Sequence, residues 1–201
     1  MELPEDLDIE DLDRLNESIV EVFRSLQSIS LLMATHKLEV KEADQIKYSD
    51  KIYEVEHQVN SFSSTGRPSN SNISSHRAIC GSCHLSMFIY VYWVLREIPI
   101  SCSIFDLFVK RLKDHLEDNG SMTLLEELDA ELLLWVLFIG GMAALGRSER
   151  VWFRTWIARK CSDLGLACWE DARSAIRGFA WVDWFCDPPS KALWNDYTRR
   201  D

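Results

Sequence analysis

The longest run of apolar residues in the chain, LLLWVLFIGGMAAL, covers residues 132–145. Four acidic residues lie just before it, in 126–131, and two arginines follow it, in 147–150. A helix dipole favours this order, with negative charge at the amino end and positive charge at the carboxyl end. The run is shorter than the roughly 20 residues that a membrane-spanning helix needs. It therefore predicts an all-α, multi-helix bundle with a fully buried central helix near residues 131–145.

Near the amino end, apolar residues recur every three or four positions, which is the spacing of a helix with one apolar face. This stripe consists of Leu12, Leu15, Ile19, Val22, Leu26, Ile29 and Met33. The spacing also fits a dimerising coiled coil, but the flanking positions lack the usual pairs of opposite charges, and Val20 and Leu31 widen the apolar face. We favour a core helix here, followed by a more polar helix over residues 37–60.

A stretch rich in serine, asparagine, glycine and proline follows at residues 61–75 and predicts an exposed loop. Beyond it, residues 77–95 are apolar and aromatic, and residues 104–116 have helical spacing. Because Pro99 interrupts the chain between them, we expect two antiparallel helices.

Two longer helices and one short helix are predicted toward the carboxyl end. One begins near Glu149 and ends at Gly165, since glycine commonly caps helices. The next begins near Trp169 and is expected to stop at Pro188-Pro189, because proline lacks the N–H that a helix interior needs. A short final helix over residues 191–197 would close the chain.

The charge of the chain is unevenly distributed. Residues 1–60 hold 15 acidic and 6 basic side chains, so most of the net charge of −10 lies there. We divide the chain into an acidic N-terminal helical segment (1–60), the exposed loop (61–75) and a helical domain (76–201), with one continuous domain over 10–198 as the alternative. Such a negative charge repels phosphate, so we expect no direct binding to nucleic acid.

The six cysteines and the amino end bear on the compartment. The chain begins MELPEDLDIEDLD, which lacks the positive charge and apolar stretch of a signal peptide. A chain of about 200 residues needs no disulfides to hold its core. We therefore expect free thiols in a reducing compartment, the nucleus or the cytoplasm, and no association with a membrane.

Landmark residues in the carboxyl half resemble a known family. They are the string LWVLFIGG at 134–141, Ala143, Ala144, Glu149-Arg150, Trp152-Phe153, Trp169-Glu170-Asp171 and Asp187-Pro188. Their order resembles the C-terminal half of the fungal-specific transcription factor domain. The resemblance covers about the last two thirds of the chain and is weaker over residues 77–116. Val151 departs from it, because similar sequences often have proline there.

This resemblance implies an all-helical regulatory region over residues 76–201. The usual host of such a region is a transcription factor with a six-cysteine binuclear zinc cluster near its amino end. The first cysteine here is Cys80, and it does not lie in basic sequence, so the sequence contains no such DNA-binding cluster. The resemblance implies a protein partner, either a zinc-cluster transcription factor or a second copy of this chain. A small apolar ligand between the helices is a further alternative.

A cysteine and histidine cluster within residues 76–84 could carry metal chemistry. Cys80, Cys83 and His84 match the C-x-x-C-H pattern of covalent haem attachment, but that attachment needs an export route that the sequence lacks. His76 would join them on one face of a helix, but one straight helix cannot surround a tetrahedral zinc ion. Cys102 is the nearest ligand candidate from a second element. We favour buried free thiols, with no metal and no cofactor.

Residues 141–148, GMAALGRS, nearly match the phosphate-binding pattern G-x-x-x-x-G-K-[ST]. Arg147 stands in place of the lysine, and the residues between the glycines are strong helix formers. Close packing of helices at Gly140 and Gly141 is the preferred explanation.

Basic residues cluster on the helix that follows the central one. The candidate partner-binding residues are Arg147, Arg150, Arg154 and Arg159 with Trp152 and Trp156, and Lys160, Arg173 and Arg177 extend the positive charge. A solvated helix face is the default explanation of this pattern, because surface charges usually only interact with water. The functional hypothesis is that it docks the acidic N-terminal segment or an acidic partner.

Residues 1–15 alternate leucine and isoleucine with acidic residues. This composition is typical of short acidic segments that fold against coactivators. We favour the simpler explanation, an acidic amino end of a helix, because acidic residues suit that end of the helix dipole.

No nucleophile elbow, zinc-protease helix or paired catalytic carboxylates occur in the sequence. We therefore expect a non-enzymatic regulatory or interaction protein with no catalytic residues, acting by binding a protein or a small ligand. The alternative is a helical enzyme or accessory protein of metabolism with a ligand pocket between its helices.

Overall fold

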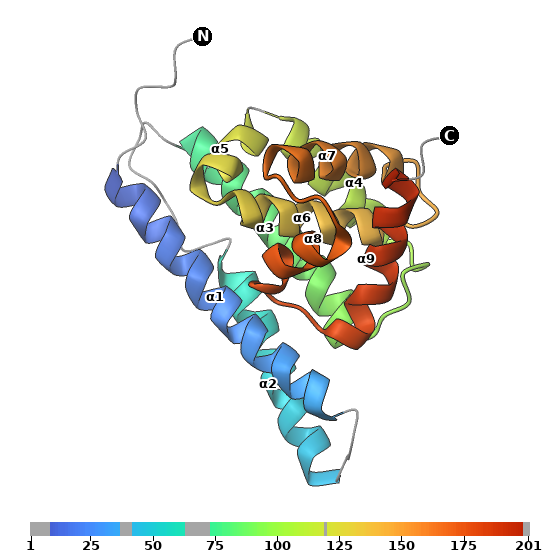
Figure 1. Cartoon of the computed structure of the whole chain (residues 1–201). Coiled ribbons are helices and arrows are strands. Elements are labelled where there is room, and N and C mark those ends of the chain that lie inside the picture. The colour runs from blue at the N-terminus through green and yellow to red at the C-terminus, as the bar shows by residue number, and fades with distance from the viewer. Residues whose placement is uncertain (1–8, 37–41, 63–72, 119, 199–201) are drawn as a thin grey trace.

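The computed structural model describes residues 9–36, 42–62, 73–118 and 120–198. These residues form nine α-helices and one π-helical turn, with no strand among them (Figure 1). The helices are α1 (Ile9–His36), α2 (Glu42–Phe62), α3 (Ile73–Tyr90), α4 (Ile104–Glu117), α5 (Ser121–Leu128), α6 (Ala130–Ala143), α7 (Arg150–Asp163), α8 (Trp169–Arg177) and α9 (Asp183–Thr198), and the π turn is η1 (Val91–Leu95). The predicted all-α bundle is confirmed.

Helix α6 is the centre of the fold, as its apolar run predicts. Residues 132–144 are all buried, and α3, α4, α5, α7, α8 and α9 pack around them. Asp129 caps the amino end of the helix, because its carboxylate accepts hydrogen bonds from the backbone N–H groups of Glu131 (2.9 Å) and Leu132 (3.0 Å). Its end is earlier than predicted, because α6 stops at Ala143 and the Leu145 side chain is 53% exposed.

The first two helices form an antiparallel hairpin that extends beyond the rest of the bundle (Figure 1). The predicted stripe on α1 is buried within the chain from Ile19 to Met33. Phe23 anchors α1 to the centre, because its ring packs edge-on against Trp135 at 4.9 Å and lies 5.3 Å from Phe179. The side chains of Leu12 and Leu15 lie outside the described residues.

The predicted loop is partly helical at both of its ends. Helix α2 ends at Phe62 and α3 begins at Ile73, so both extend into the range 61–75. Residues 63–72 lie outside the described residues. Helices α3 and α4 pack side by side, as predicted for this pair.

Gly165 ends α7, as predicted. Its φ of 69° is one that glycine adopts without strain, and its N–H donates to the Ser162 carbonyl (3.1 Å). The next N–H, of Leu166, donates to the Cys161 carbonyl (2.8 Å). These two bonds form a Schellman cap, which satisfies carbonyls that a helix end leaves open.

The predicted stop at Pro188-Pro189 is wrong. Helix α8 ends at Arg177, and α9 runs through both prolines to Thr198, so residues 191–197 are not a separate helix. A proline in a helix interior costs about 3 kcal/mol, because it removes a hydrogen bond and its ring clashes with the preceding turn. Packing outweighs that cost here, since Leu193 and Trp194 beyond the prolines are buried.

Candidate partner-binding surface

Two tryptophans lie one above the other on α7, each beside a cation. Trp152 and Trp156 are half-buried, and their ring centroids are 6.1 Å apart. The Arg159 guanidinium carbon lies 5.1 Å from the centre of the Trp156 ring, and the Lys113 Nζ atom lies 5.8 Å from that of Trp152. Both distances are within the range of cation–π attraction. We call these four residues the cation–indole surface.

Arg147, which the sequence assigns to the same basic face, is used inside the fold. Its side chain is 11% exposed, and its Nε atom donates to the Asp106 carboxylate at 2.7 Å. Its two terminal nitrogens donate to the carbonyls of Ala143 (3.0 Å) and Ile100 (2.9 Å). Arg147 thus ties the end of α6 to the segment before α4.

Arg150 and Arg154 face α9. Arg150 donates to the carboxylate of Asp196 (2.7 Å) and to the carbonyl of Gly141 (3.2 Å), and its side chain is 17% exposed. Arg154 donates to the backbone carbonyl of Asp196 (3.3 Å). The six candidates predicted from the sequence therefore do not form one surface. Among them, Arg159 is the arginine that lies against a tryptophan.

Lys160 also has charged partners within the fold. It is buried, and its Nζ atom forms hydrogen bonds of 2.7 and 2.6 Å to the two carboxylate oxygens of Glu126 on α5. A second carboxylate, that of Asp163, lies 3.3 Å away. Lys113 of the cation–indole surface had no sequence signal, because it comes from α4, about 40 positions before Trp152 in the chain.

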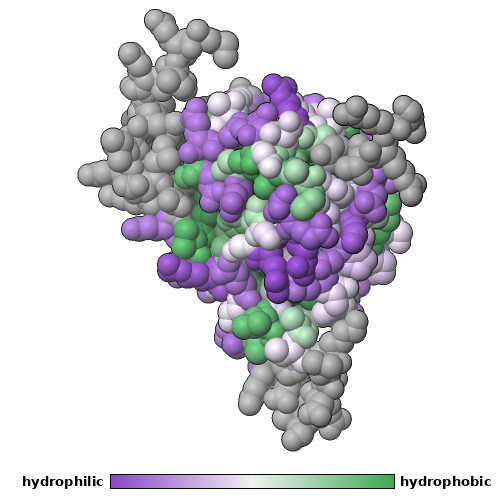
Figure 2. Space-filling model, viewed as in Figure 1, coloured by the Kyte–Doolittle hydropathy of each residue, from purple (hydrophilic) through white to green (hydrophobic). Residues whose placement is uncertain are grey.

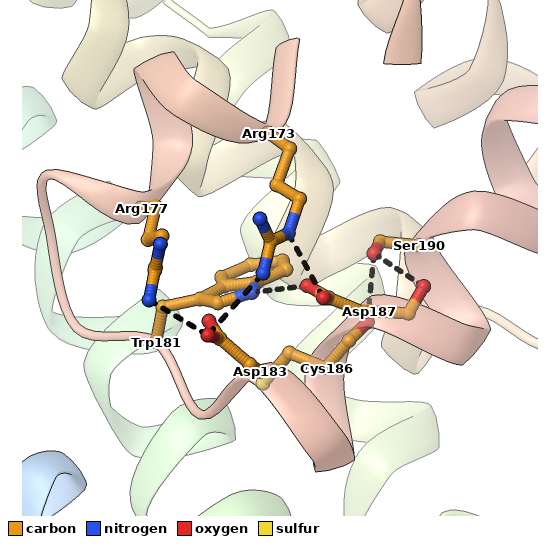
Figure 3. A network of polar contacts seen from close by, with 7 residues as sticks. All are labelled: Arg173, Arg177, Trp181, Asp183, Cys186, Asp187 and Ser190. Atoms are coloured by element: carbon orange, nitrogen blue, oxygen red, sulfur yellow. Dashed lines mark hydrogen bonds and ion pairs between the residues drawn. The ribbon is translucent and has the colours of Figure 1, made fainter. Parts of the chain in front are cut away.

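Arg173 and Arg177 are the last two residues of the basic cluster predicted from the sequence. They belong to a network of ion pairs and hydrogen bonds between α8 and α9 (Figure 3). Arg173 bridges Asp183 (3.2 Å) and Asp187 (2.9 Å), and Arg177 pairs with Asp183 (2.7 Å). The indole N–H of Trp181 donates to Asp187 at 2.8 Å. Figure 2 shows polar residues gathered over α8 and α9. These contacts position the turn between the two helices, so both arginines have a structural use.

The cysteine and histidine cluster lies on α3. Cys83 is fully buried, Cys80 and His84 are half-buried, and the side chain of His76 lies outside the described residues. Burial raises the pKa of the Cys80 thiol to about 12 and raises that of Cys83 further, which favours the protonated form that does not bind metals. Within the described part of the chain, no three His, Cys, Asp or Glu side chains are grouped as metal ligands would be.

The phosphate-binding pattern at residues 141–148 does not form a phosphate-binding loop. Residues 141–143 are the last turn of α6, and the rest form the turn that leads to α7. A carbon placed at Cβ of Gly140 would lie 2.4 Å from the Phe153 ring, and one on Gly141 would lie 2.7 Å from Leu193. The glycines allow close helix packing, as the sequence indicates.

Alkaline pH is expected to destabilise the fold. Burial raises the pKa of Cys80, Cys161 and Cys186 from 9.0 to about 12. Between these values the unfolded chain loses protons that the folded chain retains, so the free energy of unfolding is at its full value below pH 9 and falls as pH rises toward 12. Urea unfolding at a series of pH values measures this. Replacing the three cysteines by alanine should flatten the decline, and constant stability from about pH 8 to about pH 11 would contradict it.

Two shallow hollows lie beside α1. One, of about 290 Å³, is lined by Arg24, Ser25, Ser28, Ile29, Lys51, Glu54, Val55 and Gln58. The other, of about 200 Å³, is lined by Ile19, Val20, Phe23, Arg24, Gln27, Leu128, Asp129, Leu132, Gly178 and Phe179. Figure 2 shows apolar residues gathered where α1 meets the body of the domain.

None of the described helices has the length and apolar character needed to cross a membrane.

Comparison with known proteins now identifies the family. Residues 4–177 match the family described as "Fungal specific transcription factor domain". No curated protein and no solved structure matches the chain. The match reaches further toward the amino end than the sequence landmarks indicated, and it stops before α9, so Asp187-Pro188 lies outside it. Because the match covers most of its 201 residues, this chain belongs to the fungal-specific transcription factor domain family.

Proposed function

We propose that this chain is a non-enzymatic regulatory domain that acts by binding an acidic protein segment at the cation–indole surface. The observation that carries the proposal is the pairing of two half-exposed tryptophans with Arg159 and Lys113. Tryptophan and arginine are the residue types most enriched at the energetic centres of protein interfaces. The Arg159 guanidinium selects for a carboxylate beside an apolar side chain that covers the indoles, whereas the Lys113 ammonium group is already paired with Glu117 at 2.9 Å.

Family membership supports the choice of a protein partner. A transcription factor domain implies the nucleus, and we propose a zinc-cluster transcription factor or a second copy of this chain as the source of the acidic segment. Direct contact with DNA is not part of the proposal, because a net charge of −10 opposes it. A small apolar ligand is less well supported, since the two hollows of about 290 and 200 Å³ are open and partly polar.

Variants of the surface test this proposal. Trp156→Ala combined with Arg159→Glu is expected to reduce capture of acidic partners from native nuclear extract by at least about tenfold, because it removes the indole and reverses the adjacent charge. Quantitative mass spectrometry of the captured proteins measures the loss. Arg150 is kept unchanged, since its reversal would break contacts within the fold.

The matched control reverses one exposed cation elsewhere, Lys191→Glu, which changes the net charge by the same amount as Arg159→Glu. It should capture the same proteins as the unaltered chain, with the same melting temperature. If the surface variant retains the captured proteins in unchanged amounts while folding normally, the proposed surface is wrong. If both variants lose them equally, the effect is one of net charge and the surface is again not supported.

A further inference from the structure

The larger hollow is a cleft between α1 and α2. Two basic residues line it, although the segment that contains it is strongly acidic. Residues 1–60 carry 15 acidic and 6 basic side chains. In α1 and α2 the structure describes the side chains of two basic residues, Arg24 and Lys51, and both line this cleft. Two positive charges thus converge on one place in a strongly acidic region.

Neither cation is neutralised by a partner in the described part of the chain. No ion pair joins Arg24 or Lys51 to a carboxylate there, although Glu54 lines the same cleft. By contrast, Arg96, which directly follows η1, is paired with Glu56 on α2. Since neither charge has an ion-pair partner among the described residues, the cleft has room for an anion from solution.

The other lining groups show what kind of anion fits. Ser25 and Ser28 offer hydroxyl groups that form no hydrogen bond with any described residue, and Gln58 offers both a donor and an acceptor. Glu54 can accept hydrogen bonds from hydroxyl groups of a ligand but would repel a second anionic group. The buried side chains of Ile29 and Val55 form an apolar floor.

We propose that this cleft binds one anionic group, either a carboxylate or a phosphate, carried on a short polyol. The anion lies between Arg24 and Lys51, and the hydroxyl groups contact Glu54, Gln58 and the two serines. A volume of about 290 Å³ is enough for a small metabolite of this kind. Because both helices contribute, an occupied cleft ties α1 to α2. The proposal does not depend on the cation–indole surface, which lies on α7.

A matched set of three-carbon probes tests the site on the whole chain. Glycerate and glycerol 3-phosphate are titrated by calorimetry, with glycerol as the uncharged member of the set. At least one anion should bind saturably with a dissociation constant below about 10 mM, and glycerol should bind at least about tenfold more weakly. Glycerate alone binding identifies a carboxylate as the head, and glycerol 3-phosphate alone binding identifies a phosphate. Binding should weaken with added salt, because the cations are exposed.

Two variants separate the cleft from general charge effects. Arg24→Ala with Lys51→Ala should weaken binding of the anion at least about tenfold, since both charged contacts are removed. Arg111→Ala with Lys191→Ala removes the same charge from exposed sites outside the cleft and should leave binding within about twofold. The inference is overturned if neither anion saturates, if glycerol binds as well as the anions, or if the two double variants have the same effect. All four residues are exposed, so both variants are expected to fold.

Discussion

Replacing Trp135 by alanine is expected to lower the free energy of unfolding by about 3–5 kcal/mol. Trp135 is fully buried in α6, and its ring lies 4.9 Å from that of Phe23 and 6.3 Å from that of Phe179. Its indole N–H donates to the Ala180 carbonyl at 2.9 Å, so the change also leaves a buried acceptor without its donor. Urea unfolding measures the loss.

The contacts of Trp135 predict which helix loses stability first in the Trp135→Ala variant. Hydrogen exchange should become faster in α1, because Phe23 loses the partner that anchors this helix to α6. Trp156→Ala serves as the matched control, since Trp156 is only half-buried, and it should cost about 1 kcal/mol or less. A loss below about 1 kcal/mol for Trp135→Ala would show that α6 is not the centre of the core.

Gly140→Ala is expected to destabilise the protein by about 1–2 kcal/mol, although alanine is the better helix former by about 1 kcal/mol. The added carbon would lie 2.4 Å from Phe153 Cε1 and 2.9 Å from Leu112 Cδ2. Both side chains are fully buried, so neither can move aside without disturbing its neighbours. In a chain of this length the melting temperature should fall by roughly 2–8 °C.

Gly178→Ala is the matched change at an open position. Its added carbon would meet just one atom, the Ala175 carbonyl oxygen at 3.4 Å. This variant should differ from the unaltered protein by about 0.5 kcal/mol or less. If Gly140→Ala were equally neutral, or stabilising, then α6 and α7 would not pack as closely as described.

The sequence predicts the centre of the fold well because burial there is continuous. An apolar run between an acidic and a basic flank has few structural solutions in a chain of this size, and α6 is the one found. Gly165 was equally informative, because a φ of 69° at a helix end favours glycine. In both cases the residues near the element in the chain determine its structure.

Contacts between distant elements were not predictable in this way. Proline has a strong local preference against helix interiors, but α9 continues through Pro188-Pro189, because Leu193 and Trp194 pack against the core. Likewise, nearness in the sequence groups Arg147, which precedes α7, with Arg159 on α7. Whether an arginine is free depends on carbonyls and carboxylates from elsewhere, such as Asp106 for Arg147.

The extent of the family match could not be predicted from local residue patterns either. Apolar residues in helical register, such as those of α1, are common to many helical proteins and carry little family information. The sequence landmarks therefore began in the middle of the chain, whereas the match begins at residue 4. Residues 1–8 and the side chains of residues 9–15 lie outside the described residues, so the hypothesis that residues 1–15 contact coactivators stays a prediction.

Site-specific photo-crosslinking tests the central claim most directly. A photoreactive amino acid replaces Thr155, an exposed residue beside Trp156 on α7, and in a separate protein it replaces Ser174, an exposed residue on α8. In native nuclear extract, the probe at position 155 should crosslink to a protein through an acidic segment, and the probe at position 174 should not. Equal crosslinking from both positions, or none from position 155, would contradict the account that this domain works by docking a partner on α7.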